Sequence, residues 1–316
     1  MAPKGKAPAT AEAGEARPRG SWEGSEVTEA DLDLLRGSRR IPSSALVVVR
    51  AADGEEVPAP REGEAVVFHA HFMRGFGLPA SGFFRRFLNH YGLQPHHLGA
   101  NAVLMLSAFA TFCEAYLGIW PCLDLWAKLF YLKPQGPEGE MQTCGAVSIY
   151  RSPSGCFPKV DIVDSAKKWQ RSFFYVKNAQ PGVDGIDLPP FTNTVPAEKL
   201  NWAMKPRANP DLTKMLARVK ELVYTHGLKG TDLLCTFQER RVLPLQRRIH
   251  KIGHMSGRLD PSRVSIIELP TEEVARRVNK ISVAKLAPDW RWGMEPYSRA
   301  NMPPKVCFAG CAVEPA

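Results

Sequence analysis

The stretch "LQPHHLGANAVLMLSAFATFCEAYLGIWPCLDLW", residues Leu93 to Trp126, decides the fold because it sets polar side chains inside a long apolar run. It contains the adjacent pair His96 and His97, two cysteines, a glutamate and an aspartate. Three interpretations compete for it: a membrane span, a metal site, or a core helix of a globular domain. The spacing of the polar residues distinguishes them.

The membrane interpretation has length in its favour but not flanking charge. Leu98 to Leu117 is apolar at 15 of 20 positions, close to the length of a spanning helix. Glu114 interrupts the apolar run, and no basic residues flank it as anchors. A helix that is apolar nearly all round is also typical of the centre of a helical layer. We therefore expect a core helix and no membrane partner.

The metal interpretation fails on spacing. Structural zinc sites use cysteines and histidines in short pairs. Here Cys113 and Cys122 are nine positions apart, and the only close cysteine pair, Cys307 and Cys311, has no histidine pair nearby. A metal site built from distant residues stays open as an alternative, but we predict no metal ligands and no cofactor.

Catalytic motifs are also missing from the sequence. It contains no P-loop, no G-x-S-x-G, no H-E-x-x-H and no G-x-G-x-x-G. Asp161 and Asp164 form the only close acid pair that two-metal phosphoryl transfer could use in this region. We therefore predict no catalytic residues and a protein that is not an enzyme.

Composition favours an intracellular protein with an anionic partner. The chain has 316 residues, a net charge of +9 and a pI of about 9.2. A positive excess favours nucleic acid or another anion as a partner. The seven cysteines are widely spaced, and the first 20 residues contain no apolar signal segment. We expect free thiols and no secretion, with nucleus and cytoplasm both left open.

Local patterns predict an α+β fold that is predominantly helical. Helices are expected at 81–91, 99–117 and 121–131, where they build the central core. A small sheet is expected to pair 65–72, 143–151 and 171–178. Thr28 is expected to cap a short helix, "ALVVVR" (45–50) is a further strand candidate, and Gly92 is expected to end the first core helix.

Composition shifts along the chain divide it into five parts. We predict the following organisation: a disordered tail at 1–25, a main α+β domain at 26–180, a proline-rich connector at 181–210, a basic helical subdomain at 211–286, and an irregular tail at 287–316.

One stretch of the basic subdomain is a candidate nucleic-acid site. Between residues 211 and 263 there are 11 Lys or Arg and five Asp or Glu, an excess of six of the net +9. Such clusters can contact phosphates. The candidate contact residues are Arg240, Arg241, Arg247, Arg248 and Lys251. The alternative is that these side chains pair with carboxylates or pack their stems on the core.

Several of these motifs occur together in one known family. "RGFGLP", "HHL", "CEAYLGI" and "ERRVLPLQRRIH" follow one another in an order that resembles the gypsy-type transposon domain, which is found in many copies in plant genomes, especially grasses. The resemblance covers roughly Val66 to Arg263. One departure is Gly99–Ala100, where the family commonly has a proline.

The resemblance implies an origin in a retroelement reading frame, but it supplies no catalytic residues. We expect a non-enzymatic structural or interaction module. The alternative is a nucleic-acid-binding, packaging-type protein that uses the 240–251 stretch, and a transposase-type nuclease comes third. The expected partners are RNA or DNA, further copies of the chain, or other proteins of the element.

Overall fold

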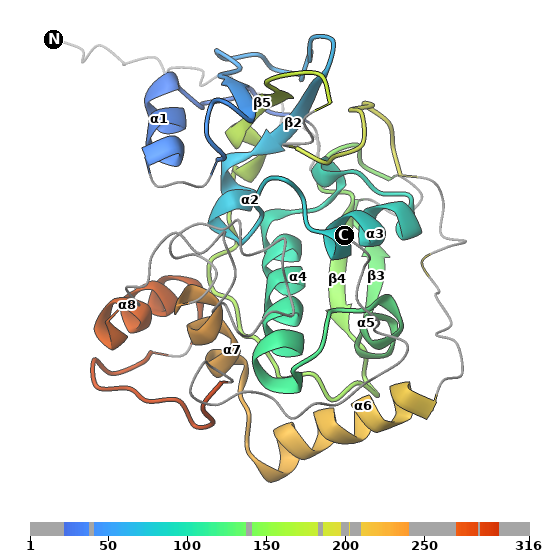
Figure 1. Ribbon diagram of the computed structural model, residues 1–316, viewed down its shortest axis with the longest axis vertical. Helices are drawn as coiled ribbons and strands as arrows, with labels where there is room; N and C mark the ends of the chain where they lie inside the picture. Colours follow the sequence, from blue (N-terminus) through green and yellow to red (C-terminus); the bar gives the residue numbers. More distant parts are fainter. Residues whose placement is uncertain are drawn as a thin grey trace, which may run out of the picture.

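The computed structural model describes residues 22–37, 41–136, 141–182, 186–196, 202, 210–239, 270–283 and 285–296. Within these ranges the chain forms eight α-helices and five β-strands, which confirms the predicted α+β class. In Figure 1 a small sheet lies at one end of the molecule and helix α6 at the other, with helix α4 running between them.

Helix α4 (Ala100–Phe112) answers the question raised by the opening stretch. It begins directly after Gly99 and continues as a π-helical turn, η2 (Cys113–Leu117), so its bounds agree with the prediction of 99–117. The run Ala100–Leu117 is long and apolar enough to cross a membrane, but 78% of it is buried inside the protein. That burial is what a core helix requires.

Helix α3 (Gly82–Tyr91) confirms the apolar face predicted for 81–91. The Oγ of Ser81 accepts a hydrogen bond from the backbone N–H of Phe84 at 3.1 Å, which satisfies one of the free donors at the helix start. Gly92 ends the helix in the left-handed region, with φ of +62°. The predicted stop at this glycine is therefore confirmed.

The third core helix is shorter than the predicted 121–131. Helix α5 (Leu123–Leu129) ends at Leu129, and the next residues form strand β3 (Phe130–Pro134). The ring of Phe130 stacks on Trp126, with 4.3 Å between ring centroids. Phe130 therefore reaches the core from a strand, and the prediction that it continues the helix is wrong.

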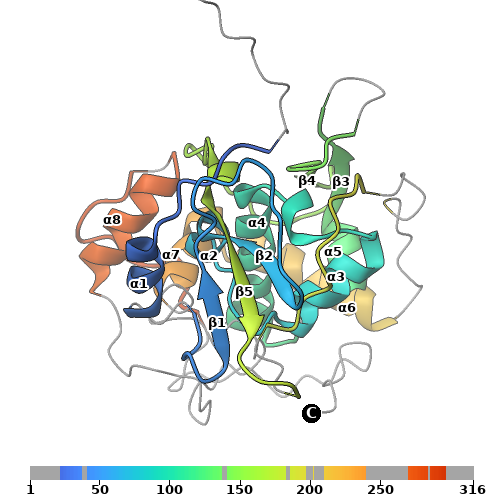
Figure 2. The same cartoon turned by 90° about the horizontal axis from the view of Figure 1, so that it is seen from above.

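The main sheet is antiparallel and has the order β1-β5-β2. Its strands are β1 (Val47–Arg50), β5 (Phe173–Asn178) and β2 (Glu64–Phe68), seen side by side in Figure 2. The predicted pairing of the segment near 65 with the segment near 171 is confirmed, as is the strand at 45–50.

Two details of the predicted sheet are wrong. Strand β4 (Val147–Arg151) does not join it, because β4 pairs with β3 in a separate two-stranded sheet. The predicted strand at 65–72 is also too long, since its last residues belong to helix α2 (His69–Met73). Alternation of apolar residues marks a strand, but it does not select the strand's partner.

Helix α1 (Glu29–Gly37) starts at the cap predicted for it. The backbone N–H of Asp31 donates to Thr28 Oγ1 at 3.3 Å, and the N–H of Thr28 donates to Asp31 Oδ2 at 2.9 Å. The two residues thus satisfy one another's backbone donors, as in a capping box.

The segment predicted as a disordered tail, 1–25, includes four residues that the structure describes. Trp22 is 8% exposed, and its ring lies nearly parallel to that of Phe68, with 6.1 Å between centroids. The Ser25 hydroxyl donates to the carbonyl of Phe173 at 2.6 Å. These last four residues are packed against β2 and β5 rather than disordered, because Trp22 completes an apolar cluster there. Residues 1–21 lie outside the described residues.

The predicted helical region at 211–286 contributes three helices that pack on the central core. They are α6 (Pro210–Lys220) with its π-helical turn η4 (Glu221–Thr225), α7 (Gly230–Phe237) and α8 (Thr271–Ile281). Helix α6 buries Leu212, Met215 and Val219 in the same core as α3 to α5. Helix α7 packs along α4, and α8 packs on α7.

Candidate functional site

His96 and His97, the pair that suggested a metal site, are packed within the protein. The two residues form the short 3-10 turn η1 (Pro95–His97). The Nδ1 of His97 accepts from the N–H of Gln94 at 3.0 Å, so its Nε2 carries the proton and donates to the Thr194 carbonyl at 2.7 Å. The ring of His96 lies 5.4 Å from that of Trp22. Both imidazoles thus join segments that are distant in sequence.

A third histidine, His71, is held in the same region. Its Nε2 donates to the carbonyl of Leu98 at 3.0 Å, and its ring stacks on Trp169 with 5.2 Å between centroids. Burial lowers the pKa of His71 to about 3 and that of His96 to about 2, and it also lowers the pKa of His97. The three imidazoles are therefore neutral at pH 7 and enclosed, which is unsuited to proton exchange with a substrate.

The cysteines that the structure describes are free thiols. Four are buried and one is partly buried: Cys113, Cys144, Cys156, Cys235 and Cys122. Burial raises the pKa of Cys144 and of Cys235, so both thiols stay protonated and unreactive near neutral pH. Among the described residues, no three histidines, cysteines or acids gather as ligands for a metal ion.

The acid pair considered for two-metal chemistry is tied to cations. An oxygen of Asp161 lies 2.5 Å from the Nζ of Lys159, and an oxygen of Asp164 lies 2.6 Å from the Nη2 of Arg74. The side chain of Arg74 is 7% exposed, so Asp164 neutralises a charge that is almost buried. Each carboxylate has its own cation, whereas two-metal catalysis needs carboxylates that converge on ions about 4 Å apart.

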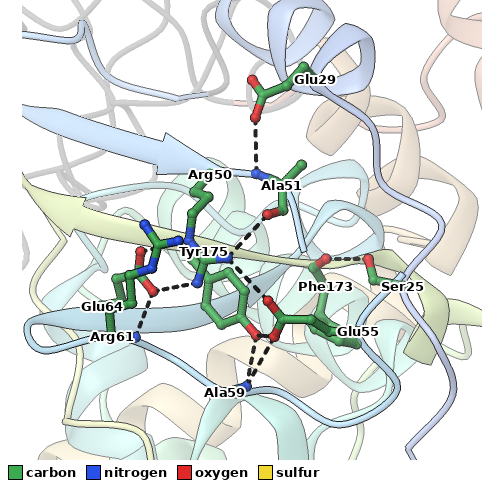
Figure 3. Close-up of polar contacts among 10 residues, drawn as sticks. All are labelled: Ser25, Glu29, Arg50, Ala51, Glu55, Ala59, Arg61, Glu64, Phe173 and Tyr175. Atoms are coloured by element: carbon green, nitrogen blue, oxygen red, sulfur yellow. Dashed lines mark hydrogen bonds and ion pairs between the residues drawn. The ribbon is translucent and has the colours of Figure 1, made fainter. Parts of the chain in front are cut away.

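Figure 3 shows a polar network on the main sheet that the sequence analysis did not identify. Arg50 donates Nε and Nη2 to the two carboxylate oxygens of Glu64, at 3.0 and 2.7 Å. Its Nη1 donates to Glu55 at 3.1 Å, and its guanidinium carbon lies 3.9 Å from the centre of the Tyr175 ring. Arg50 therefore connects all three strands with the loop that carries Glu55.

The network satisfies its own charges. The Tyr175 hydroxyl donates to Glu55, and the N–H of Ala59 donates to the Tyr175 oxygen at 2.8 Å. The hydrogen bonds from Arg50 lower the pKa of Glu64. Burial raises the pKa of Glu55, but the bonds from Tyr175 and Arg50 outweigh burial and the net pKa is lowered. Because its charged groups bond to one another, the network holds the loop with Glu55 and Ala59 against the sheet. The sequence signal for it is a single arginine that ends an apolar strand and is followed by several glutamates.

The basic residues predicted to contact nucleic acid lie outside the described residues: Arg240, Arg241, Arg247, Arg248 and Lys251. The described chain stops just before them, at Glu239, two residues after the end of α7.

A cavity of about 730 Å³ opens at the amino end of α7. Four segments line it: the end of β4 with the loop that follows it (151–161), residues 223–232 around the start of α7, Ser282 and Leu286 after α8, and residues 290–293. Gly230 lets two of these walls meet, because a Cβ at this position would lie 1.9 Å from the Lys159 carbonyl oxygen. The cavity is thus assembled from segments that lie far apart in sequence.

The rim of the cavity carries more positive than negative charge. Its basic residues are Arg151, Lys159, Lys229 and Arg291, and its acids are Asp161 and Asp232. Asp161 is paired with Lys159, and Asp232 is buried with an oxygen 2.9 Å from the N–H of Lys229. Burial raises the pKa of Asp232. Within the part of the chain that the structure describes, Arg151, Lys229 and Arg291 have no carboxylate at ion-pair distance. The cavity therefore favours an anion.

Comparison with known proteins identifies one segment of the chain. Residues 66–134 match the family model described as "Putative gypsy type transposon". No curated protein and no solved structure matches the chain. The matched segment runs from β2 through the core helices α3, α4 and α5 to β3, so it includes the opening stretch. The resemblance predicted from 135 to 263 lies beyond the match and stays a prediction. The match confirms the predicted resemblance to the gypsy-type transposon family over residues 66–134.

Proposed function

We propose that the protein is a non-enzymatic structural or interaction module of a gypsy-type retroelement reading frame. The family match supports the origin. The observation that carries the proposal is the state of the reactive side chains. The histidines of the core are neutral and enclosed, the thiols of Cys144 and Cys235 are held protonated, and the Asp161 and Asp164 carboxylates are paired with cations. These histidines, thiols and carboxylates therefore serve packing and ion pairing.

The test of this proposal is a cleavage and strand-joining assay on labelled DNA with Mg²⁺ or Mn²⁺. We expect intact substrate over hours, and the same result for the variant with Asp161→Asn and Asp164→Asn. Cleavage by the wild-type chain that disappears in this double variant would overturn the proposal, because two-metal chemistry depends on such carboxylates.

A second candidate function is nucleic-acid binding, with RNA or DNA held by the 240–251 stretch. The electropositive cavity rim at the amino end of α7 favours it, because the rim cation Lys229 lies eleven residues before Arg240 in the sequence. Several cations of one protein can contact successive phosphates of one strand. Self-association and other element-encoded proteins are the competing partners.

Salt dependence tests the second candidate. We expect the affinity for a single-stranded oligonucleotide to fall steeply with salt, with a slope of about −0.7 per phosphate contact on logarithmic axes. Changing Arg240, Arg241, Arg247 and Arg248 together to Glu should abolish binding. Affinity that does not depend on salt, or that survives this change, would remove the candidate.

A further inference from the structure

We infer that the cavity at the amino end of α7 binds a nucleotide, as one unit of a single-stranded nucleic acid. The inference rests on the nucleic-acid-binding function proposed above, and it gives that function a second contact site in the described part of the chain. Three independent features of the cavity support it: the backbone at its floor, the cations at its rim, and the aromatic rings in its walls.

The first feature is the start of α7. The first residues of the helix, Gly230 and Thr231, line the cavity, and N–H groups at these positions have no partner within a helix. Asp232 accepts from the backbone N–H of Lys229, so its carboxylate satisfies a different donor from these two. A helix start with free N–H groups and a positive end of the dipole is suited to a phosphate oxygen.

The second feature is a set of three cations that face the same space. Arg151, Lys229 and Arg291 all line the cavity and are exposed. The Nη1 of Arg151 donates to the Phe157 carbonyl at 2.7 Å, which fixes the guanidinium and leaves its other N–H groups for a ligand. They come from three different segments, so their convergence is a property of the fold rather than of a charged run.

The third feature is a pair of aromatic rings in the same walls. Tyr224 is 72% exposed, the largest exposed fraction among the large apolar side chains that the structure describes. Trp290 also lines the cavity, and its ring lies 4.8 Å from that of Trp292. Trp292 is anchored by an Nε1 donation to Thr236 at 3.0 Å. Tyr224 is thus an exposed ring and Trp290 a partly buried one, and aromatic rings beside cations are the surface on which unpaired bases stack.

Together these features select the ligand class. Phosphate alone would need no aromatic wall, and an apolar ligand would need no cations. A nucleotide uses both, and a base can reach a ring only when it is unpaired, which favours a single strand over a duplex. The volume of about 730 Å³ lies within the range of small-molecule pockets, about 300–1,000 Å³.

The experiment measures fluorescence anisotropy of a labelled single-stranded oligonucleotide of about ten residues on the full chain. Two variants change the cavity: Lys229→Glu with Arg291→Glu, and Tyr224→Ala. The matched control is Lys128→Glu with Lys167→Glu, which changes the same charge at exposed positions that do not line the cavity. Thermal unfolding of each variant checks that it is folded. Nucleoside monophosphates and inorganic phosphate serve as competitors.

We expect the charge-reversal variant to lose at least tenfold more affinity than its control, and Tyr224→Ala to lose about tenfold. Nucleoside monophosphates should displace the oligonucleotide at concentrations where inorganic phosphate does not. If a nucleoside monophosphate binds as tightly as the oligonucleotide, the cavity is still a nucleotide site, and its ligand is a free nucleotide rather than a unit of a nucleic acid.

Two results would overturn the inference about the cavity, and both can be distinguished from a result that removes nucleic-acid binding as a whole. If the wild type binds and the four-arginine variant does not, while both cavity variants match their control, nucleic-acid binding stands and the cavity plays no part. If inorganic phosphate competes as well as a monophosphate, the cavity is an anion site and not a nucleotide site. If the wild type binds no oligonucleotide at low salt, both proposals fail together.

Discussion

The ring of Phe109 in α4 meets the ring of Trp126 in α5 edge to face, with 5.2 Å between centroids and 82° between planes. Both side chains are completely buried. This contact joins two helices of the segment that matches the transposon family, and it lies at the centre of the core. The opening stretch of sequence thus supplies two helices to the core.

Replacing Phe109 by Ala should lower the free energy of unfolding by about 3–5 kcal/mol, because it leaves a cavity among aromatic rings. Denaturant unfolding followed by tryptophan fluorescence measures the change. The matched control is Leu34→Ala, at a position that is 70% exposed, which should change stability by less than about 0.5 kcal/mol. Equal effects in the two variants would mean that α4 is not a core helix.

Lowering the pH from about 7 to 5 should destabilise the protein through its buried histidines. The folded-state pKa values of His71, His96 and His97 lie below the ordinary value of 6.5, so the unfolded chain takes up protons in this range and the folded chain does not. The contribution of the neutral imidazoles to the free energy of unfolding is therefore fully present above about pH 6.5. Below that pH it falls by up to about 1.4 kcal/mol per pH unit for each histidine.

His96→Phe keeps an aromatic ring beside Trp22 and Phe191, so it should reduce this loss. Urea unfolding at several pH values provides the measurement. Leu34→Ala is the control, because that side chain is 70% exposed and carries no titratable group. Stability that stays constant between about pH 7 and 5 would show that the three imidazoles are not buried in the neutral form.

Arg50 and Glu64 should show strong energetic coupling. Their side chains are 23% and 9% exposed and form a bidentate pair, so removal of one partner leaves a poorly solvated charge. A double-mutant cycle with Arg50→Met and Glu64→Gln should give about 1–3 kcal/mol. The exposed pair Arg36 and Asp33 should give less than about 1 kcal/mol in a parallel cycle. A coupling for Arg50 no larger than this control would show that the network is not a loop clamp.

The buried thiols should resist alkylation in the native state. Cys113, Cys144 and Cys235 are each 0% exposed, so iodoacetamide should label them only after denaturation. Cys122, which is partly buried, should react earlier. Peptide mass spectrometry of a labelling time course distinguishes the sites. Rapid native labelling of Cys144 would contradict the packing described for it.

Local features of the fold were predictable from the sequence because they depend on neighbours in the chain. The start of α4 after Gly99, the cap at Thr28 and the stop at Gly92 each follow from one or two residues. Strand pairing depends on segments that are distant in sequence, and the predicted partner of β4 was wrong for this reason. Phe130 is apolar and fits the sequence pattern both as a further residue of helix α5 and as the first residue of strand β3. Its packing on Trp126 belongs to the tertiary structure and is not visible in the local sequence.

The candidate site was less predictable than the fold. Its cations, Arg151, Lys229 and Arg291, span 140 positions of sequence and form no motif. The Arg50 network likewise depends on β1 and β2 lying on either side of β5. A charge run such as 240–251 is visible in the sequence, whereas a convergent set of charges appears only when the chain is folded.

The most direct test of the central claim combines binding and integrity in one sample. The chain is incubated with labelled single-stranded RNA or DNA and Mg²⁺ or Mn²⁺, anisotropy is recorded at low and high salt, and the strand is then recovered on a denaturing gel. A binding module that is not an enzyme should hold the strand in a salt-dependent manner and return it intact. Cleaved or joined strands, produced by the wild type and not by the variant with Asp161→Asn and Asp164→Asn, would contradict the account.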